Sequence, residues 1–361
     1  MIIPELPDYL TSLGGGDYKG LIIALFTVTA MLSRPFSGKL TDTIGRMPVI
    51  LFGIIVCLVC SLCYPILTSL SGFFLLRLLH GFSTGFSPTG SAAYMADLIP
   101  PHKRGEAMGI LGTAGTLGMA AGPAIGGSVA NQFGLNSMFY LSSFFALLAI
   151  VIVVRSKETL KQKQKFSFAH LKVKREDLFE PRVLVPCMIM LLTAFAYGAI
   201  YTLIPDFGKH LGIRNKGLLF TFFTVSSLAV RLLAGKASDR YGREPILRIS
   251  TLVMTTAMLV IGFATSKEML MLGVTIYGLA QGSTSPTLLA WATDLSEEHL
   301  KGRGISSLYI FMEFGIGSGA FISGLIYGNN PEMFLISFLT CATLCALAFL
   351  YLASRPILAR S

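Results

Sequence analysis

Long apolar segments alternate with short polar ones along nearly the whole of the 361-residue chain. Each segment is close to the ~20 residues that an α-helix needs to cross the hydrocarbon core of a bilayer. Most contain Gly, Pro or Ser, which bilayer helices tolerate because neighbouring helices satisfy the freed backbone groups. The pattern predicts an all-α integral membrane protein with eleven spans, at 20–37, 48–69, 72–98, 107–130, 136–154, 183–206, 216–234, 246–265, 269–294, 303–327 and 333–353.

One connection is much longer and more polar than the others. Residues 155–182 read RSKETLKQKQKFSFAHLKVKREDLFEPR and lie near the middle of the chain. We therefore predict an N-terminal bundle over residues 1–154, a basic linker over 155–182 and a C-terminal bundle over 183–361.

The two halves carry the same polar motifs in one register. GKLTDTIGRMP at 38–48 recurs as GKASDRYGREP at 235–245, an offset of 197. A dozen positions share this offset, among them the helix-end charges Arg34 and Arg231, Asp97 and Asp294. Because both copies then have the same polarity in the membrane, we expect two pseudo-symmetric bundles related by an axis along the membrane normal. Charges present in both copies are expected to serve architecture or gating.

The beginning of the chain matches the middle of a longer element. LPDYLTSLG at 6–14 is similar to IPDFGKHLG at 204–212, which follows a full apolar segment. We therefore expect residues 1–10 to be the end of a first span that this chain mostly lacks, so that the intact fold has twelve helices. A short loop and an incomplete signal peptide are the alternatives, but neither explains the match and no basic n-region is present.

Composition and charge support a membrane protein. Hydrophobic residues make up 53% and charged residues 13% of the chain, whereas soluble domains carry about 25% charged residues. If the 38–47 loop is cytoplasmic and the sides alternate, the cytoplasmic segments hold 21 Lys and Arg and the opposite side five. This bias follows the positive-inside rule and places the C-terminus in the cytoplasm. The net charge of +10 therefore reports topology, and nucleic-acid binding is not expected.

Both motif loops, with the two six-helix halves and the basic linker, resemble the major facilitator superfamily. They are similar to its Gly-x-x-x-Asp-x-x-Gly-Arg-[Lys/Arg] signature, from which Met47 and Glu244 depart at the last position. Gly38 would let a helix approach closely, Gly45 would permit a positive φ, and Asp42 could cap a helix start or pair with a basic group. The resemblance implies a gating role for Gly38, Asp42, Gly45, Arg46, Gly235, Asp239, Gly242 and Arg243. The simpler alternative is that the basic residues only anchor the topology.

A glycine-rich string in the fourth apolar segment is similar to the antiporter motif of that family, G-x8-G-x3-GP-x2-GG. GILGTAGTLGMAAGPAIGG matches it at every fixed position: Gly109, Gly118, Gly122, Pro123, Gly126 and Gly127. Glycines four apart also form ordinary helix contacts, but the whole string is much rarer. In the family it marks exporters that exchange substrate for protons.

Four titratable residues occur in only one half and are candidates for proton coupling or for the transport cavity: Glu313, Glu5, Arg77 and His80. RLLHG at 77–81 resembles the family's Arg-x-x-Gln-Gly, whose arginine is assigned to proton transfer. A carboxylate or guanidinium inside a span is costly and is by default functional. The alternatives are a protonated helix contact for Glu313, an exposed helix end for Glu5, snorkelling of Arg77 and packing of His80.

The resemblance implies a secondary active transporter in the cell membrane, performing proton-coupled efflux of small organic compounds by alternating access. The alternatives are an importer (symporter) of a sugar, organic acid or siderophore, and a transport-inactive truncated membrane protein. Its partners would be a small-molecule substrate and the lipid bilayer, and such bundles can work as monomers. We expect no cofactor and no metal, the proton gradient being the energy source. No nucleotide loop, zinc set or catalytic nucleophile constellation appears in the sequence, so an enzyme is not expected.

Overall fold

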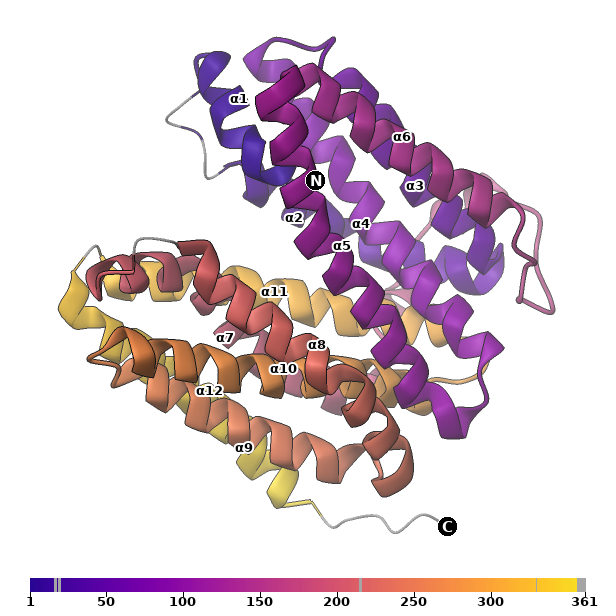
Figure 1. The fold of residues 1–361 in the computed structure, drawn as a ribbon. Coiled ribbons are helices and arrows are strands. Elements are labelled where there is room, and N and C mark those ends of the chain that lie inside the picture. Colours follow the sequence, from indigo (N-terminus) through magenta and orange to yellow (C-terminus); the bar gives the residue numbers. More distant parts are fainter. Residues whose placement is uncertain (16–17, 19–20, 214–215, 329, 356–361) are drawn as a thin grey trace. The chain divides into compact units, whose positions relative to one another are not determined.

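The structure, a computed structural model, describes residues 1–15, 18, 21–213, 216–328 and 330–355, and in this part of the chain all regular structure is helical (Figure 1). A short helix, α1 (Leu6–Ser12), precedes eleven long ones, each of which overlaps one predicted apolar segment. The predicted fold class is confirmed. The long helices are α2 (Leu21–Thr43), α3 (Arg46–Cys63), α4 (Leu70–Leu98), α5 (Arg104–Phe133), α6 (Leu135–Val154), α7 (Leu184–His210), α8 (Lys216–Tyr241), α9 (Arg243–Gly262), α10 (Lys267–Leu295), α11 (Lys301–Tyr327) and α12 (Phe334–Ala353).

Among the described residues, nine helices are long and apolar enough to cross a membrane. The other two long helices, α4 and α10, have 29 residues each. They overlap predicted segments too, but their Gly, Ser, Thr and Pro residues lower the mean hydropathy. Both occupy the same position in the sequence repeat, so their polar character belongs to the repeated architecture.

The chain forms two compact units. Unit 1 comprises Met1–Leu98, Ala114–Glu180 and Ser296–Ser307, and unit 2 comprises Ile99–Thr113, Pro181–Leu295 and Leu308–Ser361. The units follow the two halves of the sequence, except that the start of α5 belongs to unit 2 and the start of α11 to unit 1. The bundle boundaries at 154 and 183 stay a prediction, because compactness does not define where a membrane bundle ends.

Helix packing repeats between the units. In unit 1, α2 packs against α4, and α3 packs against α4 and α6. In unit 2, α8 packs against α10, and α9 packs against α10 and α12. These pairs correspond helix by helix under the 197-residue offset, so the sequence repeat is also a repeat of helix contacts.

Aromatic side chains dominate the core of unit 1. The rings of Tyr64 and Phe139 stack with centroids 5.0 Å apart, and Tyr9 meets Phe139 edge-on at 5.4 Å. The Tyr9 hydroxyl donates a 2.6 Å hydrogen bond to the carbonyl oxygen of Tyr64. Tyr9 comes from α1, so the short N-terminal helix is part of this core.

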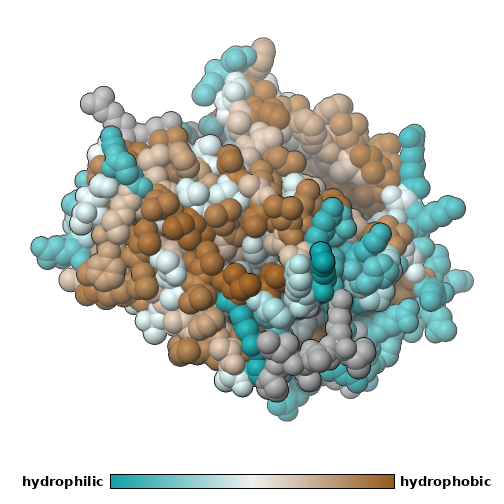
Figure 2. All heavy atoms as spheres, turned by 60° about the horizontal axis from the view of Figure 1, so that its bottom comes forward, coloured by the Kyte–Doolittle hydropathy of each residue, from teal (hydrophilic) through white to brown (hydrophobic). Residues whose placement is uncertain are grey.

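Large apolar side chains also lie on the surface of both units. Hydrophobic residues cover broad areas of the face shown in Figure 2. Ile152, Leu233 and Phe321, for example, are each 68% exposed. Exposed apolar area of this extent would be unfavourable in water and is what a lipid-facing surface requires.

Candidate functional site

The motif loops are tight turns between long helices. Gly45 separates α2 from α3 and has φ +126°, and Gly242 separates α8 from α9 with φ +95°. Side chains with a Cβ rarely adopt this conformation, so glycine is required at both turns. The positive φ that we expected at Gly45 is found.

Asp42, near the end of α2, caps the start of α11 within unit 1. Its carboxylate accepts hydrogen bonds from the backbone N–H groups of Gly302 (2.7 Å) and Arg303 (2.8 Å). It also accepts a 3.0 Å hydrogen bond from Arg46 Nη1. A helix N-terminus carries unpaired N–H donors and partial positive charge, so it stabilises this carboxylate. Asp42 therefore makes both interactions considered for it, the cap and the ion pair.

A second carboxylate holds the same helix start. Arg46, which is 1% exposed, donates from Nε to Asp97 at 2.9 Å. Asp97 also accepts a 2.8 Å hydrogen bond from Lys301 Nζ, and Lys301 is the first residue of α11. We call Asp42, Arg46, Asp97 and Lys301 the Asp42 cluster. It is a continuous chain of alternating charges, which makes each charge a partner of the next.

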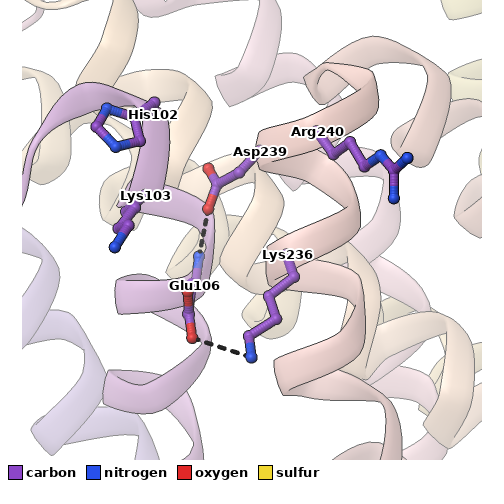
Figure 3. Close-up of a pocket in the computed structure, with 6 residues that line it drawn as sticks. All are labelled: His102, Lys103, Glu106, Lys236, Asp239 and Arg240. Atoms are coloured by element: carbon purple, nitrogen blue, oxygen red, sulfur yellow. Dashed lines mark hydrogen bonds and ion pairs between the residues drawn. The ribbon is translucent and has the colours of Figure 1, made fainter.

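Unit 2 contains the equivalent arrangement at the start of α5. Asp239 accepts hydrogen bonds from the N–H groups of Gly105 (2.8 Å) and Glu106 (2.9 Å). Figure 3 shows the bond from Glu106 to Asp239 and, beside it, the ion pair between the Glu106 carboxylate and Lys236, which are 3.3 Å apart. An open pocket at the helix start is lined by His102, Lys103, Glu106, Lys236, Asp239 and Arg240.

The remaining charges of unit 2 complete the correspondence. Arg243 donates to Asp239 at 2.6 Å and to Asp294 at 2.9 Å, and Asp294 accepts a 3.0 Å hydrogen bond from Arg104. We call these four residues the Asp239 cluster. Each lies 197 positions from its counterpart in the Asp42 cluster, including Arg104 and Lys301. Sequence reasoning missed this last pair, although the same offset would have found it.

Glycines bring the helices of each cluster close together. A Cβ on Gly38 would lie 3.0 Å from the carbonyl oxygen of Gly302. A Cβ on Gly235 would lie 2.5 Å from the carbonyl oxygen of Gly105. A Cβ on Gly38 would also lie 2.9 Å from Ser306 Cβ. Real Cβ atoms essentially never come closer than 3.0 Å to another heavy atom, so a larger residue at either position would push the two helices apart.

The halves differ in how the last helix of each is tied to the motif loop. Glu158, just after α6, accepts 3.0 Å hydrogen bonds from the N–H groups of Arg46 and Met47 at the start of α3. At the offset of 197, Glu158 corresponds to Arg355 and Met47 to Glu244. Arg355 lies 3.7 Å from Glu244 at the start of α9. The connection is thus made in both halves, by a carboxylate and backbone N–H groups in the first and by an ion pair in the second. Neither Glu158 nor Arg355 was among our candidates.

The linker is also tied to the start of α11. Asp177 accepts a 2.7 Å hydrogen bond from Lys39 and lies 3.5 Å from Arg303. Burial disfavours its charged form, but the hydrogen bonds from Lys39 and the N–H of Lys174, with the charges of Lys39 and Arg303, hold the pKa of Asp177 below its usual value. Asp177 is therefore an anion that bridges α2 and α11 within unit 1.

Arg77 faces the interior of unit 1. It is 1% exposed and donates from Nε to the carbonyl oxygen of Ile22 at 2.8 Å. Its Nη1 donates to the Tyr64 hydroxyl at 3.3 Å, and its guanidinium lies 4.6 Å from the centre of the Phe26 ring. Arg77 therefore does not snorkel towards the headgroups but lies inside unit 1. Its role in proton transfer stays a prediction.

His80 lies one turn further along α4. It is buried, and its ring contacts those of Phe26 and Tyr64, the aromatic residues that also contact Arg77. Its Nδ1 has no hydrogen-bond partner among the described residues. The structure thus brings two of the four one-sided candidates into one group.

The end of the antiporter-like string contacts the beginning of the chain. Cβ atoms on Gly122 and Gly126 would lie 3.0 Å and 2.8 Å from backbone atoms of Met1. A Cβ on Gly127 would lie 3.2 Å from Glu5 Oε1. Glu5, which is half-buried, therefore lies against this part of α5.

Other positions of the string have different surroundings. Gly109, at the end of α5 that belongs to unit 2, lies against α8, where its Cβ would be 2.9 Å from the carbonyl oxygen of Arg231. Around Gly118, by contrast, no atom of the described residues lies within 4 Å of an added Cβ. Pro123 lies inside α5 without interrupting it. The string is therefore a series of separate contacts and not one uniform packing face.

The paired span arginines bond polar groups of their own units. Arg34 donates to Thr89 Oγ1 at 2.9 Å and is fully buried in unit 1. Arg231 donates to Ser227 Oγ at 3.3 Å in unit 2. The Arg34 bond joins α2 to α4, whereas the Arg231 bond joins two residues of α8. The architectural role of this pair stays a prediction.

Glu313 is buried within unit 2. It is 7% exposed and lies in α11. Two residues further on, a Cβ on Gly315 would lie 2.6 Å from the carbonyl oxygen of Leu191, so α11 and α7 are in close contact here. Glu313 thus avoids the lipid-facing surface, whereas Arg77, His80 and Glu5 belong to unit 1.

The repeated helix packing, the paired charge clusters and the exposed apolar surface are typical of a multi-pass membrane protein. The sequence profile of the Major Facilitator Superfamily matches residues 1–217 and 187–360. The chain belongs to this family, whose members are transporters and not enzymes.

Relatives of similar sequence carry transporter names. Multidrug resistance protein MdtG of Enterobacter lignolyticus (strain SCF1) is 26% identical over 91% of this chain and 82% of its own length. Multidrug resistance protein 2 of Bacillus subtilis (strain 168) is 26% identical over 69% of this chain, which spans only 65% of that relative. The MFS-type transporter MJ1560 of Methanocaldococcus jannaschii is 25% identical over 90% of this chain and 86% of its own length.

Solved structures share the fold. The human organic anion transporter MFSD10 (TETRAN) superimposes with a TM-score of 0.81 over 97% of this chain and 89% of its own, at 20% identity. The proton:xylose symporter XylE superimposes with a TM-score of 0.79 over 97% of this chain and 90% of its own, at 15% identity. At these identities the likeness concerns the fold alone.

Proposed function

We propose that this transporter exports small organic compounds in exchange for protons by alternating access. The observation that carries the proposal is the pair of charge clusters. In each cluster, an aspartate from the motif loop of one half of the sequence caps the start of a helix from the other half. Such a contact holds the halves together on one side of the membrane and can be released when that side opens.

The strength of the caps suits a reversible lock. A hydrogen bond to a charged group contributes about 1.5–3 kcal/mol, and each cap contains two from backbone N–H groups. Differential binding of substrate or proton to the two states can shift an equilibrium of that size. The clusters would thus stabilise one state without making it permanent.

Proton coupling needs a group that gains and loses a proton during the cycle. Glu313 is our candidate because it is a buried carboxylate that occurs in only one half. A carboxylate that cannot hold a proton and a substrate favourably at the same time would couple their movements. Arg77 and His80 are the corresponding candidates in unit 1 and would assist proton transfer.

Two features favour export. The antiporter-like string is complete in one half, and the named relatives include multidrug resistance proteins. The likeness to a sugar symporter concerns only the fold and favours neither direction. The distribution of Lys and Arg supports a cytoplasmic linker and C-terminus. We place the protein in the cell membrane, with substrate taken up from the cytoplasmic side.

Everted membrane vesicles test the proposal. A panel of fluorescent organic cations and anions is offered to vesicles with the interior acidified, and accumulation is compared with and without the gradient. We expect gradient-driven accumulation by the parent chain and its loss in Glu313→Gln, with the probe still bound. Glu332→Gln, at an exposed position after α11, is the matched control and should transport normally.

The outcomes separate the parts of the proposal. If the parent chain accumulated the probe equally with and without the proton gradient, proton coupling would be overturned. Undiminished accumulation in Glu313→Gln would remove Glu313 from the coupling role. Transport only in right-side-out vesicles would favour the importer.

A further inference from the structure

The middle of the linker is strongly basic. Residues 161–175 contain no Asp or Glu and six basic residues, Lys161, Lys163, Lys165, Lys172, Lys174 and Arg175. Nothing in the transport mechanism proposed above uses this charge. A basic segment directly beside membrane spans is attracted to anionic lipid headgroups, at about 1 kcal/mol per Lys or Arg near the surface.

This segment is attached to the end of a span at two points. The N–H of Gln164 donates a 2.8 Å hydrogen bond to the carbonyl oxygen of Thr43, the last residue of α2. Lys39, one turn earlier in α2, donates a 2.8 Å hydrogen bond to the carbonyl oxygen of Lys172. The turn 164–172 is therefore held at the end of α2, a helix long and apolar enough to span a membrane.

Internal hydrogen bonds give the turn a defined shape. The N–H of Ser167 donates to His170 Nδ1 at 3.0 Å, and His170 Nε2 lies 2.8 Å from Gln164 Oε1. A short 3-10 helix, Phe168–Leu171, follows. In Figure 1 the linker is the loop that leaves the end of α6.

Two phenylalanines project from this turn. Phe166 is 53% exposed and Phe168 is 82% exposed, and their ring centroids lie 5.8 Å apart. Fully burying a Phe side chain contributes about 1.5–3 kcal/mol, and an aqueous loop would forgo this. Aromatic rings flanked by lysines are the side chains that enter the lipid–water interface most favourably.

We propose that the turn 164–172 is a membrane-surface anchor. Phe166 and Phe168 insert among the lipids of the cytoplasmic leaflet, while the surrounding lysines bind anionic headgroups. The inference rests on the orientation given under the proposed function and not on the transport activity. The lysines of the turn are opposite in charge to anionic headgroups, and the turn is attached to the end of a span. For these two reasons we propose lipid, and not a soluble protein, as its binding partner.

A single-tryptophan variant tests the anchor directly. The chain has one tryptophan, Trp291, so Trp291→Phe with Phe168→Trp places the only indole on the turn. The protein is reconstituted in nanodiscs of neutral lipid, or of neutral lipid mixed with phosphatidylglycerol. We expect blue-shifted emission and quenching by brominated acyl chains, both stronger with phosphatidylglycerol. Both should weaken at about 1 M salt, where the Debye length is about 3 Å.

Two comparisons make the result decisive. Adding Lys163→Gln and Lys165→Gln should reduce the difference between the two lipid mixtures. Indole emission typical of water and unquenched in both mixtures would overturn the anchor and leave the Phe pair as a surface for a soluble protein. Equal quenching in both mixtures would overturn the assignment of anionic lipid. Fluorescence is read without substrate or proton gradient, so failure of transport would not affect the result.

Discussion

Replacing Asp42 by Asn should release the start of α11. The carboxylate is 5% exposed and accepts hydrogen bonds from two backbone N–H groups and from Arg46. The single amide oxygen of Asn can keep one of the two backbone bonds, and the charge is lost from all three. Removing one partner of a buried charge pair costs about 3–5 kcal/mol. Because Arg46 retains Asp97 and the carbonyl oxygen of Thr41, we take the lower end, about 3 kcal/mol.

Hydrogen–deuterium exchange measures this release at the capped amides themselves. A loss of about 3 kcal/mol corresponds to about two orders of magnitude in the opening equilibrium. We expect exchange at Gly302 and Arg303 to accelerate by that factor in Asp42→Asn. The matched variant Asp239→Asn should accelerate exchange more at Gly105, whose cap it removes, than at the start of α11. An acceleration below about threefold in Asp42→Asn would refute the reasoning, because the cap would then contribute almost nothing.

Three further predictions concern packing, the linker and the span arginine. Gly235→Ala places a methyl group against the backbone of α5 and should lower thermal stability in detergent by about 1–3 kcal/mol, whereas Gly118→Ala should be neutral; equal losses would contradict the packing geometry. The lowered pKa of Asp177 means that its stabilisation is fully present above the unfolded pKa of about 3.9 and is lost as pH falls through the lower folded value. Relative to the Asp177→Asn chain at the same pH, the linker of the parent chain should be cut more slowly by pepsin above about pH 4 and equally fast well below it. A transition near neutral pH would contradict this assignment. Arg77→Lys keeps the charge but cannot donate to two groups in fork geometry. A proton-transfer role predicts altered pH dependence of transport, while unchanged pH dependence with lowered stability would show a packing role only.

The helices could be predicted from the sequence because each helix that crosses a bilayer must be a long apolar segment. A span must be apolar over about 20 residues, and the breaks between spans fall at charged turns such as GKLTDTIGRMP. The repeat added the correspondence of the halves, including the glycine turns at Gly45 and Gly242. Local physics was sufficient for these features.

The partners of the motif charges were harder to predict. Asp42 bonds residues 260 positions away in sequence, and nothing local indicates which helix start it caps. Lys301 and Arg104 were accessible through the offset, whereas the exchange of Glu158 for Arg355 conceals that connection, because a search for matching residue types passes over it. The Phe pair was hidden because exposure in a loop depends on hydrogen bonds to α2, which tertiary structure alone provides.

The two helix-end connections use side chains of opposite charge, so they are not interchangeable. Glu158 meets N–H donors at the start of α3, but the start of α9 would present it with Glu244. Arg355 suits Glu244, but at the start of α3 it would face the positive end of a helix dipole. The starts of α3 and α9 occupy equivalent positions in the repeat, yet each favours the charge of its own partner. In a chimera with Glu158 and Arg355 interchanged, Glu would face Glu244 at the start of α9, and Arg would face the positive end of the α3 dipole. Both connections would then be electrostatically unfavourable.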